Sequence, residues 1–323
     1  MPHDSLDLEE MNVGVIDIGT NTVLLLVARL DTSGNITPLV YEQRVPRLGK
    51  GVDAEKNLQA DSMQRVIGVL KEYRAMMAQH RLATAVVAGT SAVRDAHNKD
   101  EFAELVKREV GFDLEVLSGD EEAHWTYRGA ISGVPDFQRA TVVDIGGGSS
   151  EITVGDASSI HNKISLDIGS VRLTERFFKH DPPTHPELEA AITFVEDELS
   201  KPRGFEFDGS TLIGVAGTST SLAILAQRLR EFNMAAVTNY QLTLDKVNAL
   251  FQTLRAMSSD EILELSAVMQ GRNDVIAAGA LILREIMTHF KFGEMVVSER
   301  GVRYGLALRE WEKRLSKHSG RVQ

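Results

Sequence analysis

The chain carries the same succession of motifs twice. An apolar run ending in Asp-Ile-Gly occurs in VIDIGTNT, residues 15–22, and again in VVDIGGGSSE, residues 142–151. A second motif, VAGTS, occurs at residues 87–91 and 215–219. The two Asp-Ile-Gly motifs are 127 positions apart and the two VAGTS motifs 128, so both order and spacing recur. Solenoids repeat every 20–50 residues or so, and this period is much longer. It therefore indicates two half-molecules of one topology.

A third match is weaker and shows where the halves differ in length. LEVLSGDEEA begins at Leu114 and EMVVSERGVR begins at Glu294, and their serines, Ser118 and Ser298, are 180 positions apart. The second half therefore carries about fifty additional residues between its VAGTS motif and its last strand. We expect this insertion near residues 222–272, where the apolar pattern is typical of helices.

The local patterns favour an α/β fold in each half. The strands that lead into Asp-Ile-Gly are apolar and β-branched, as strands buried on both faces are. Each is predicted to return as a hairpin. A third strand or its loop follows in EQRVPRLGKG and HNKISLDIGS, then a helix, then the strand that ends in VAGTS. Ligands of such folds bind beyond the strand ends and between lobes. The sequence thus predicts two similar α/β lobes with a cleft between them.

We expect the first lobe to span residues 1–120 and the second lobe to span residues 121–323. A last helix, residues 301–316, is able to pack back across the first lobe. Further helices are predicted at residues 60–80, 99–110, 119–131, 186–199, 245–257 and 273–290.

Composition limits the classes of function. The 323 residues include no cysteine, which excludes disulfide frameworks and thiolate metal sites and favours a reducing compartment, so we expect a cytoplasmic protein. The formal net charge of −11 argues against nucleic-acid partners, although a local cleft can still attract a small anion. No window holds the roughly eighteen apolar residues of a membrane helix, so no membrane partner is expected.

Four turns rich in hydrogen-bond donors are candidate phosphate sites. Glycine lets a ligand approach the backbone closely, and successive amides of one turn can face one anion. In the VAGTS motifs the turn also opens a helix, whose N-terminus adds free amides and a positive dipole. Because both kinds of turn are duplicated, phosphate binding is favoured over tight turning alone. The candidate residues are Thr20, Asn21, Thr22, Gly146, Gly147, Gly148, Ser149, Gly217 and Thr218.

Two acids accompany the second glycine turn. Asp144 ends a buried strand and Glu151 lies on the predicted return strand, so a hairpin can bring them together. Carboxylates beside a phosphate repel it unless a cation lies between, and Mg²⁺ or Mn²⁺ suits oxygen ligands of this kind. We therefore predict a metal site at Asp144 and Glu151. The equivalent Asp17 can bind metal through water or cap its own turn.

Arg94 lies about one helical turn after the first VAGTS motif, where its guanidinium can bind a phosphate with two parallel hydrogen bonds. The alternative is a surface ion pair with Asp95 or Asp120. The matched position in the second half is Leu222, which carries no charge, so we expect the lobes to differ in role.

Two further acids, Glu121 and Glu122, occur in SGDEEA at the predicted junction of the lobes. There they can complement the dipole of a helix capped by Ser118 or Asp120. A carboxylate at the junction can also take a proton from an attacking water. Spacing alone does not choose between Glu121 and Glu122.

Together the motifs resemble the Ppx/GppA family, which contains exopolyphosphatases and guanosine pentaphosphate phosphohydrolases. The resemblance covers residues 12–308. It implies the fold of the actin, sugar kinase and heat-shock chaperone superfamily, a duplicated ribonuclease H-like fold, in a short two-domain form, and a homodimer. The motifs that carry it are VIDIGTNT, AGTSAVRDAHN, SGDEEA, VVDIGGGSSE, LDIGSVRLTERF, GVAGTSTSLA and SERGVRYGL.

The resemblance also implies individual roles. Glu122 corresponds to the family's catalytic glutamate, and Arg94 to its phosphate-binding arginine. Asp144 and Glu151 correspond to its metal-associated acids, and the glycine, TNT and second AGT turns resemble its phosphate loops. One departure is His124, which follows Glu-Glu-Ala where the family commonly has Arg or Lys.

We therefore expect an exopolyphosphatase, in which Glu122 activates water for metal-dependent hydrolysis of the terminal phosphoanhydride bonds of inorganic polyphosphate. Guanosine pentaphosphate (pppGpp) is the alternative substrate. An ATP-dependent kinase, or a non-catalytic sensor of polyphosphate or an alarmone, would be a function of another class. Orthophosphate release without an acceptor separates the hydrolase from the kinase, and turnover separates it from the sensor.

Overall fold

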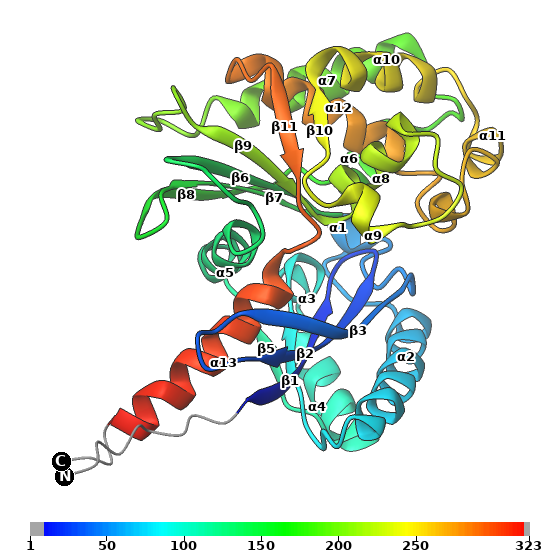
Figure 1. Ribbon diagram of the computed structural model, residues 1–323. Helices are drawn as coiled ribbons and strands as arrows, with labels where there is room; N and C mark the ends of the chain where they lie inside the picture. The colour runs from blue at the N-terminus through cyan, green and yellow to red at the C-terminus, as the bar shows by residue number, and fades with distance from the viewer. Residues whose placement is uncertain (1–9, 320–323) are drawn as a thin grey trace.

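The computed structural model describes residues 10–319 and contains two mixed β-sheets (Figure 1). The first sheet has five strands in the order β3-β2-β1-β4-β5, and the second has six in the order β10-β11-β9-β6-β7-β8. We call the five-stranded sheet with the helices around it the first lobe, and the six-stranded sheet with the helices around it the second lobe. Read from the opposite edge, β8-β7-β6-β9-β11 repeats the first order, and β10 is additional. The predicted fold of two similar α/β lobes is confirmed.

Each lobe begins with three consecutive strands, and helices separate the strands that follow, as the repeated pattern predicts. The first sheet contains β1 (Met11–Ile18), β2 (Val23–Leu30), β3 (Ile36–Arg44), β4 (Val86–Gly89) and β5 (Leu114–Val116). The second contains β6 (Ala140–Ile145), β7 (Ser150–Gly155), β8 (Ile160–Leu166), β9 (Thr211–Val215), β10 (Gln241–Thr243) and β11 (Glu294–Val297).

The helices cover both faces of each sheet, and the chain's apolar residues pack between helix and sheet. Those before β6 are α1 (Val52–Glu55), α2 (Ala60–Gln79), α3 (Ser91–Asp95), α4 (Lys99–Val110) and α5 (Gly119–Ile131). Those after it are α6 (Ser170–Phe177), α7 (His185–Leu199), α8 (Ala216–Ala226), α9 (Met234–Val237), α10 (Leu244–Leu254), α11 (Ser259–Leu263), the 3₁₀ turn η1 (Ala267–Met269), α12 (Ile276–His289) and α13 (Val302–Ser319).

Each Asp-Ile-Gly motif ends the central strand of its sheet. β1 pairs antiparallel with β2 and parallel with β4, and β6 pairs in the same way with β7 and β9. Residues on β1 and β6 are mostly buried, which explains their apolar, β-branched sequences. Because parallel strands end at one edge, the Asp-Ile-Gly and VAGTS turns of each lobe come together there.

Helices α5 and α13 each cross from one lobe to the other. They begin within the two segments of the third sequence match, LEVLSGDEEA and EMVVSERGVR. α5 follows β5 but packs on the second sheet, whereas α13 follows β11 but packs on β1 and β2 of the first (Figure 1). They also pack against each other. A Cβ atom on Gly129 would lie 2.2 Å from the carbonyl oxygen of Gly301, and one on Gly305 would lie 1.8 Å from that of Trp125. Only glycine permits this approach of two helix backbones.

The structure refines two sequence expectations. The third strand of the first lobe, β3, ends at Arg44, so most of EQRVPRLGKG is loop; Pro46 cannot donate to a ladder there. The insertion is helical apart from β10, a three-residue edge strand beside β11 that is too short to show a periodicity. The predicted lobe boundary after residue 120 falls within α5 and stays a prediction. Within residues 10–319, every helix is too short or too polar to serve as a membrane span.

Candidate active site

The two Asp-Ile-Gly turns are closed by the same backbone hydrogen bond. Gly19 N–H donates to the carbonyl of Thr22 at 2.9 Å, and Gly146 N–H donates to that of Ser149 at 3.0 Å. The threonines of the VAGTS motifs also match. The Thr90 and Thr218 hydroxyls donate to the carbonyls of Ile18 and Ile145, at 3.4 and 3.1 Å. Each lobe therefore fastens its two turns into one unit, and the duplicated motifs build duplicated structures.

The carbonyls and amides of the glycine turn differ in their hydrogen bonding. The first residues of α6 donate to all three carbonyls, whereas the amides of Gly147 and Gly148 have no acceptor among residues 10–319. Successive free amides form a concave site for an anion. The three contacts are Ser170 N to Gly146 O at 2.9 Å, Val171 N to Gly147 O at 2.8 Å, and Arg172 Nε to Gly148 O at 2.6 Å.

The glycine turn also touches the first lobe. A Cβ atom on Gly147 would lie 2.9 Å from the Thr20 Cβ, and one on Gly148 would lie 2.4 Å from the Ser91 Oγ. Larger residues would push the lobes apart, so these glycines are needed for the close approach of the two lobes.

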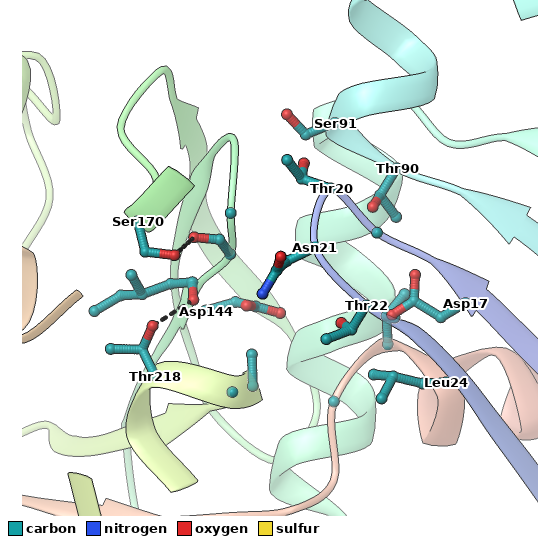
Figure 2. A pocket seen from close by; sticks show the side chains of 18 of the residues that line it. Asp17, Thr20, Asn21, Thr22, Leu24, Thr90, Ser91, Asp144, Ser170 and Thr218 are labelled. Atoms are coloured by element: carbon teal, nitrogen blue, oxygen red, sulfur yellow. Dashed lines mark hydrogen bonds between the residues drawn. The ribbon is translucent and has the colours of Figure 1, made fainter. Parts of the chain in front are cut away.

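Both lobes line one cleft, whose polar side chains come from all four turns. In Figure 2, Asp17 and Thr22 lie on one wall, Asp144 and Thr218 lie on the opposite wall, and Asn21 points between them. The Asn21 amide bridges the lobes by donating to the carbonyl of Gly271 at 3.0 Å. The predicted residues that line this cleft are Thr20, Asn21, Thr22, Glu122, Asp144, Gly146, Gly147, Gly148, Ser149, Gly217 and Thr218.

The acids of SGDEEA have separate surroundings. Glu121 completes a capping box with Ser118: its carboxylate accepts from the Ser118 N–H at 2.9 Å, and its own N–H donates to the Ser118 hydroxyl at 3.2 Å. Glu122 lies one residue further along α5, is 7% exposed, and lines the cleft. Glu121 thus caps the helix, and Glu122 is the acid that can reach a ligand.

Arg94 lies directly behind Glu122 rather than on the cleft wall. Its Nη1 donates to Glu122 Oε2 at 2.7 Å and to the carbonyl of Leu117 at 3.0 Å. Burial raises the pKa of Glu122, and the Arg94 guanidinium opposes that rise. In this conformation Arg94 orients a carboxylate, and neither Asp95 nor Asp120 is its partner.

The two acids predicted to hold a metal face each other across the second hairpin. Asp144 on β6 is directly opposite Glu151 on β7, and Glu151 accepts from the Ser165 hydroxyl at 2.6 Å. Glu151 is 2% exposed and lies behind Asp144, outside the cleft lining. In the first lobe, the residue opposite Asp17 is Leu24, so at this position the first hairpin has one carboxylate where the second has two.

These acids hold their protons unusually tightly. Burial, with added repulsion from Glu122, raises the pKa of Asp17 to about 7 and that of Asp144 to about 8. The same two causes raise the pKa of Glu151 well above its ordinary range. The buried Oδ1 atom of Asp17 has no hydrogen-bond partner within residues 10–319. Such crowding of carboxylates around one cleft favours a cation between them.

Two arginines that the sequence analysis missed also line the cleft. Arg272 lies over Gly217, since a Cβ atom there would be 1.5 Å from its Nη1, and its Nη2 donates to Gln43 at 3.0 Å. Burial lowers its pKa to about 10, and its Nε has no partner among the described residues. Arg303 is 4% exposed, and its guanidinium lies 4.3 Å from the ring centre of Tyr41.

The motifs explain why these arginines were missed. Arg272 is at the end of the inserted segment, which has no counterpart in the first half. Arg303 belongs to SERGVRYGL, whose match with SGDEEA in the first half is weak. That match is real in the structure, because both segments open a helix that crosses to the other lobe.

The chain is 33% identical over 315 residues to exopolyphosphatase 2 of Mycobacterium tuberculosis, a match that covers 92% of this chain and 97% of that protein. It is 34% identical to the bifunctional 3-dehydroquinate synthase/phosphatase of Fusobacterium nucleatum over 298 residues, which are 88% of this chain but only 44% of that longer protein.

A solved structure gives the same result. The Ppx/GppA family member of Aquifex aeolicus superposes with a TM-score of 0.80 at 33% identity, covering 95% of this chain and 99% of that one. The sequence profile described as the Ppx/GppA phosphatase family matches residues 26–314. The chain therefore belongs to the Ppx/GppA phosphatase family.

Proposed function

We propose that this protein is an exopolyphosphatase, which hydrolyses the terminal phosphoanhydride bond of inorganic polyphosphate. One observation carries the proposal: the buried carboxylate of Glu122 lines a cleft whose walls present unpartnered backbone amides. The similarity to exopolyphosphatase 2, over almost all of both chains, supports this substrate.

The terminal phosphates bind to the facing turns. The free amides of Gly147 and Gly148 and the hydroxyl of Thr20 are donors at the strand ends. Arg272 adds a positive charge from the second lobe. A phosphate chain has no apolar or hydrogen-donating part, so a cleft rich in donors suits it without recognition of a base.

Mg²⁺ or Mn²⁺ is the proposed cofactor, held by Asp144 with Glu151 behind it. The fit rests on the raised pKa values of these acids and on the orphaned oxygen of Asp17. Within residues 10–319 no three acidic or histidine side chains are grouped to hold an ion alone. Mg²⁺ commonly takes one or two carboxylates, and substrate phosphates and waters fill its other positions. When bound, the cation neutralises charge on the transferring phosphoryl group.

Glu122 is the proposed general base. It takes a proton from a water molecule as the water oxygen bonds to the terminal phosphorus, and the bridging P–O bond breaks to release orthophosphate. Arg94 holds the carboxylate in place and favours its ionised form. General-base catalysis of this kind contributes about 10²–10⁴-fold to turnover.

The direct test is a phosphate-release assay on polyphosphate of defined lengths, with and without Mg²⁺ or Mn²⁺. Release without any acceptor supports the hydrolase and excludes the kinase alternative. Tight binding without turnover would instead favour the non-catalytic sensor.

A pocket beside the cleft supports pppGpp as a second candidate substrate. It has a volume of about 530 Å³ and shares Tyr41, Gln43 and Arg272 with the cleft. The Tyr41 and Phe232 rings are parallel, with centroids 5.9 Å apart, and can support a planar base. Parallel assays with polyphosphate and pppGpp decide between the substrates. A homodimer and a cytoplasmic location stay predictions, which sedimentation and cell fractionation would check.

A further inference from the structure

A single buried arginine joins the phosphate turn of one lobe to a helix of the other. Arg172, on α6 of the second lobe, is 7% exposed. Its Nε donates to the carbonyl of Gly148 at 2.6 Å, and its Nη2 donates to Asp95 in α3 at 2.5 Å. Its Nη1 donates to Asp53 in α1. One guanidinium group thus donates hydrogen bonds to three separate segments, two of which belong to the first lobe.

These partners satisfy a charge that is costly to bury. A guanidinium removed from water is stable only when its donors are matched by acceptors and its charge is balanced. Asp53 and Asp95 supply the balance, and the Gly148 carbonyl supplies the remaining acceptor. The position of each segment is therefore tied to that of the others, since a shift in any one leaves a buried charge unpaired.

The helix that Arg172 holds also holds the proposed base. α3 is five residues long, and Asp95 follows Arg94 directly. Arg94 bonds to Glu122 at 2.7 Å, and Ser91 at the other end of α3 packs on Gly148. A continuous line of contacts therefore runs from the glycine turn through Arg172 and α3 to the Glu122 carboxylate.

We propose that Arg172 is a positioning residue that sets the distance and angle between Glu122 and the phosphate turn. It contacts neither substrate nor reacting atoms and acts through Gly148 and α3. The inference rests on the proposed function, because it concerns the geometry of the same hydrolytic step. Misplacement of a base by about 1 Å can lower turnover by about 10²-fold while the binding donors remain in place.

Arg176, one turn further along α6, is a matched control. It pairs with the same Asp53, at 2.9 Å, but is more exposed and bonds to neither Asp95 nor Gly148. Replacing Arg176 removes one cross-lobe ion pair without breaking the line to Glu122. Comparing variants of the two arginines therefore distinguishes a loss of contact between the lobes from a loss of positioning of the base.

The experiment compares R172Q, R172K, D95N and R176Q with the wild type in kcat, KM and thermal midpoint. We expect R172Q to lower kcat about 10–100-fold with KM changed less than about threefold. R172K, which retains the charge but not the fork, should recover part of that loss. D95N should resemble R172Q while keeping the buried guanidinium, and R176Q should stay within about threefold of wild type in both constants.

Amide hydrogen exchange gives a readout that needs no substrate. R172Q and D95N should speed exchange in α3. R172Q should also speed exchange of the Gly146 amide, which is hydrogen-bonded within the glycine turn, whereas R176Q should change neither. Equal kcat values for R172Q and R176Q, a loss confined to KM, or unchanged exchange in R172Q would overturn the proposal. A wild-type protein that hydrolyses neither polyphosphate nor pppGpp would overturn the proposed function instead, and exchange would still decide whether Arg172 links the two segments.

Discussion

The two lobes share a frame but differ in the charges that they place on it. Both close the Asp-Ile-Gly turn with the same hydrogen bond and fasten it to the VAGTS threonine. Opposite its aspartate, however, the first lobe has Leu24 and the second has Glu151. Seven residues into the VAGTS segment, the first lobe has Arg94 and the second has Leu222, which is fully buried.

Under the proposed function, this difference divides the chemistry between the lobes. The first lobe provides Arg94, which donates to Glu122, and the second provides the pair of carboxylates proposed to hold a metal. A duplicated frame of similar turns thus carries different charged side chains at matched positions of its two copies.

The largest expected effect tests the base. E122Q should lower kcat about 10²–10⁴-fold with little change in KM, since the amide cannot accept the proton from water. E121Q is the matched control; glutamine still serves in a capping box, so its kcat should stay within about twofold of wild type. Phosphate release at saturating polyphosphate measures both. Comparable losses in the two variants would show that helix capping matters more than the base.

The next largest effect is expected from a substitution that gives the first lobe the residue type of the second, Leu222, at the matched position 94. R94L should lower kcat about 10–100-fold, because Glu122 loses the partner that orients it. It should also move the acid limb of the kcat–pH profile to higher pH: Arg94 opposes the raised pKa of Glu122, so without it the base is protonated over a wider range. R94K should leave the limb closer to wild type. An unmoved limb in R94L would separate Arg94 from the base.

A third change removes the acid that distinguishes the second hairpin. E151Q should raise the Mg²⁺ concentration needed for half-maximal activity about 10–100-fold, as loss of a supporting carboxylate does at metal sites. Titration of activity with Mg²⁺ at fixed polyphosphate measures this. An unchanged half-saturation point would mean that Asp144 holds the cation without help from its cross-strand partner.

The smallest effect concerns stability without metal. Asp17 has a pKa of about 7 in the folded protein and near 4 in an unfolded chain, so the folded state binds the proton more tightly. Its contribution to stability therefore falls as pH rises from about 4 to about 7. D17N should unfold at a higher temperature than wild type at pH 8 in EDTA, and the difference should vanish near pH 4. Equal midpoints at pH 8 would show that Asp17 ionises without penalty.

The fold and the four turns could be predicted because they depend on backbone chemistry that a repeated motif reveals. Helices α4 and α5 begin and end where the patterns predict: α4 ends at the left-handed Gly111, and α5 begins at the capping box of Ser118 and Glu121. β10 could not be predicted, because three residues carry no periodicity and its edge position depends on β11.

The side-chain partners were harder to predict than the turns. Neither spacing nor charge distinguishes Glu121 from Glu122. The two differ because Glu121 forms the helix cap, whereas Glu122 is buried at the cleft. Arg272 was invisible for another reason. Its place over Gly217 depends on the path of the insertion, and no repeated motif reports on that path.

The exchange of α5 and α13 has a consequence for synthesis on the ribosome. One face of the first sheet, including Val15 and Leu26, is covered by Tyr304 and Leu306 of α13. Translation produces those strands early and α13 nearly three hundred residues later. The nascent first lobe therefore carries an uncovered apolar face while the whole second lobe is made, and it is a natural client for chaperones until α13 docks.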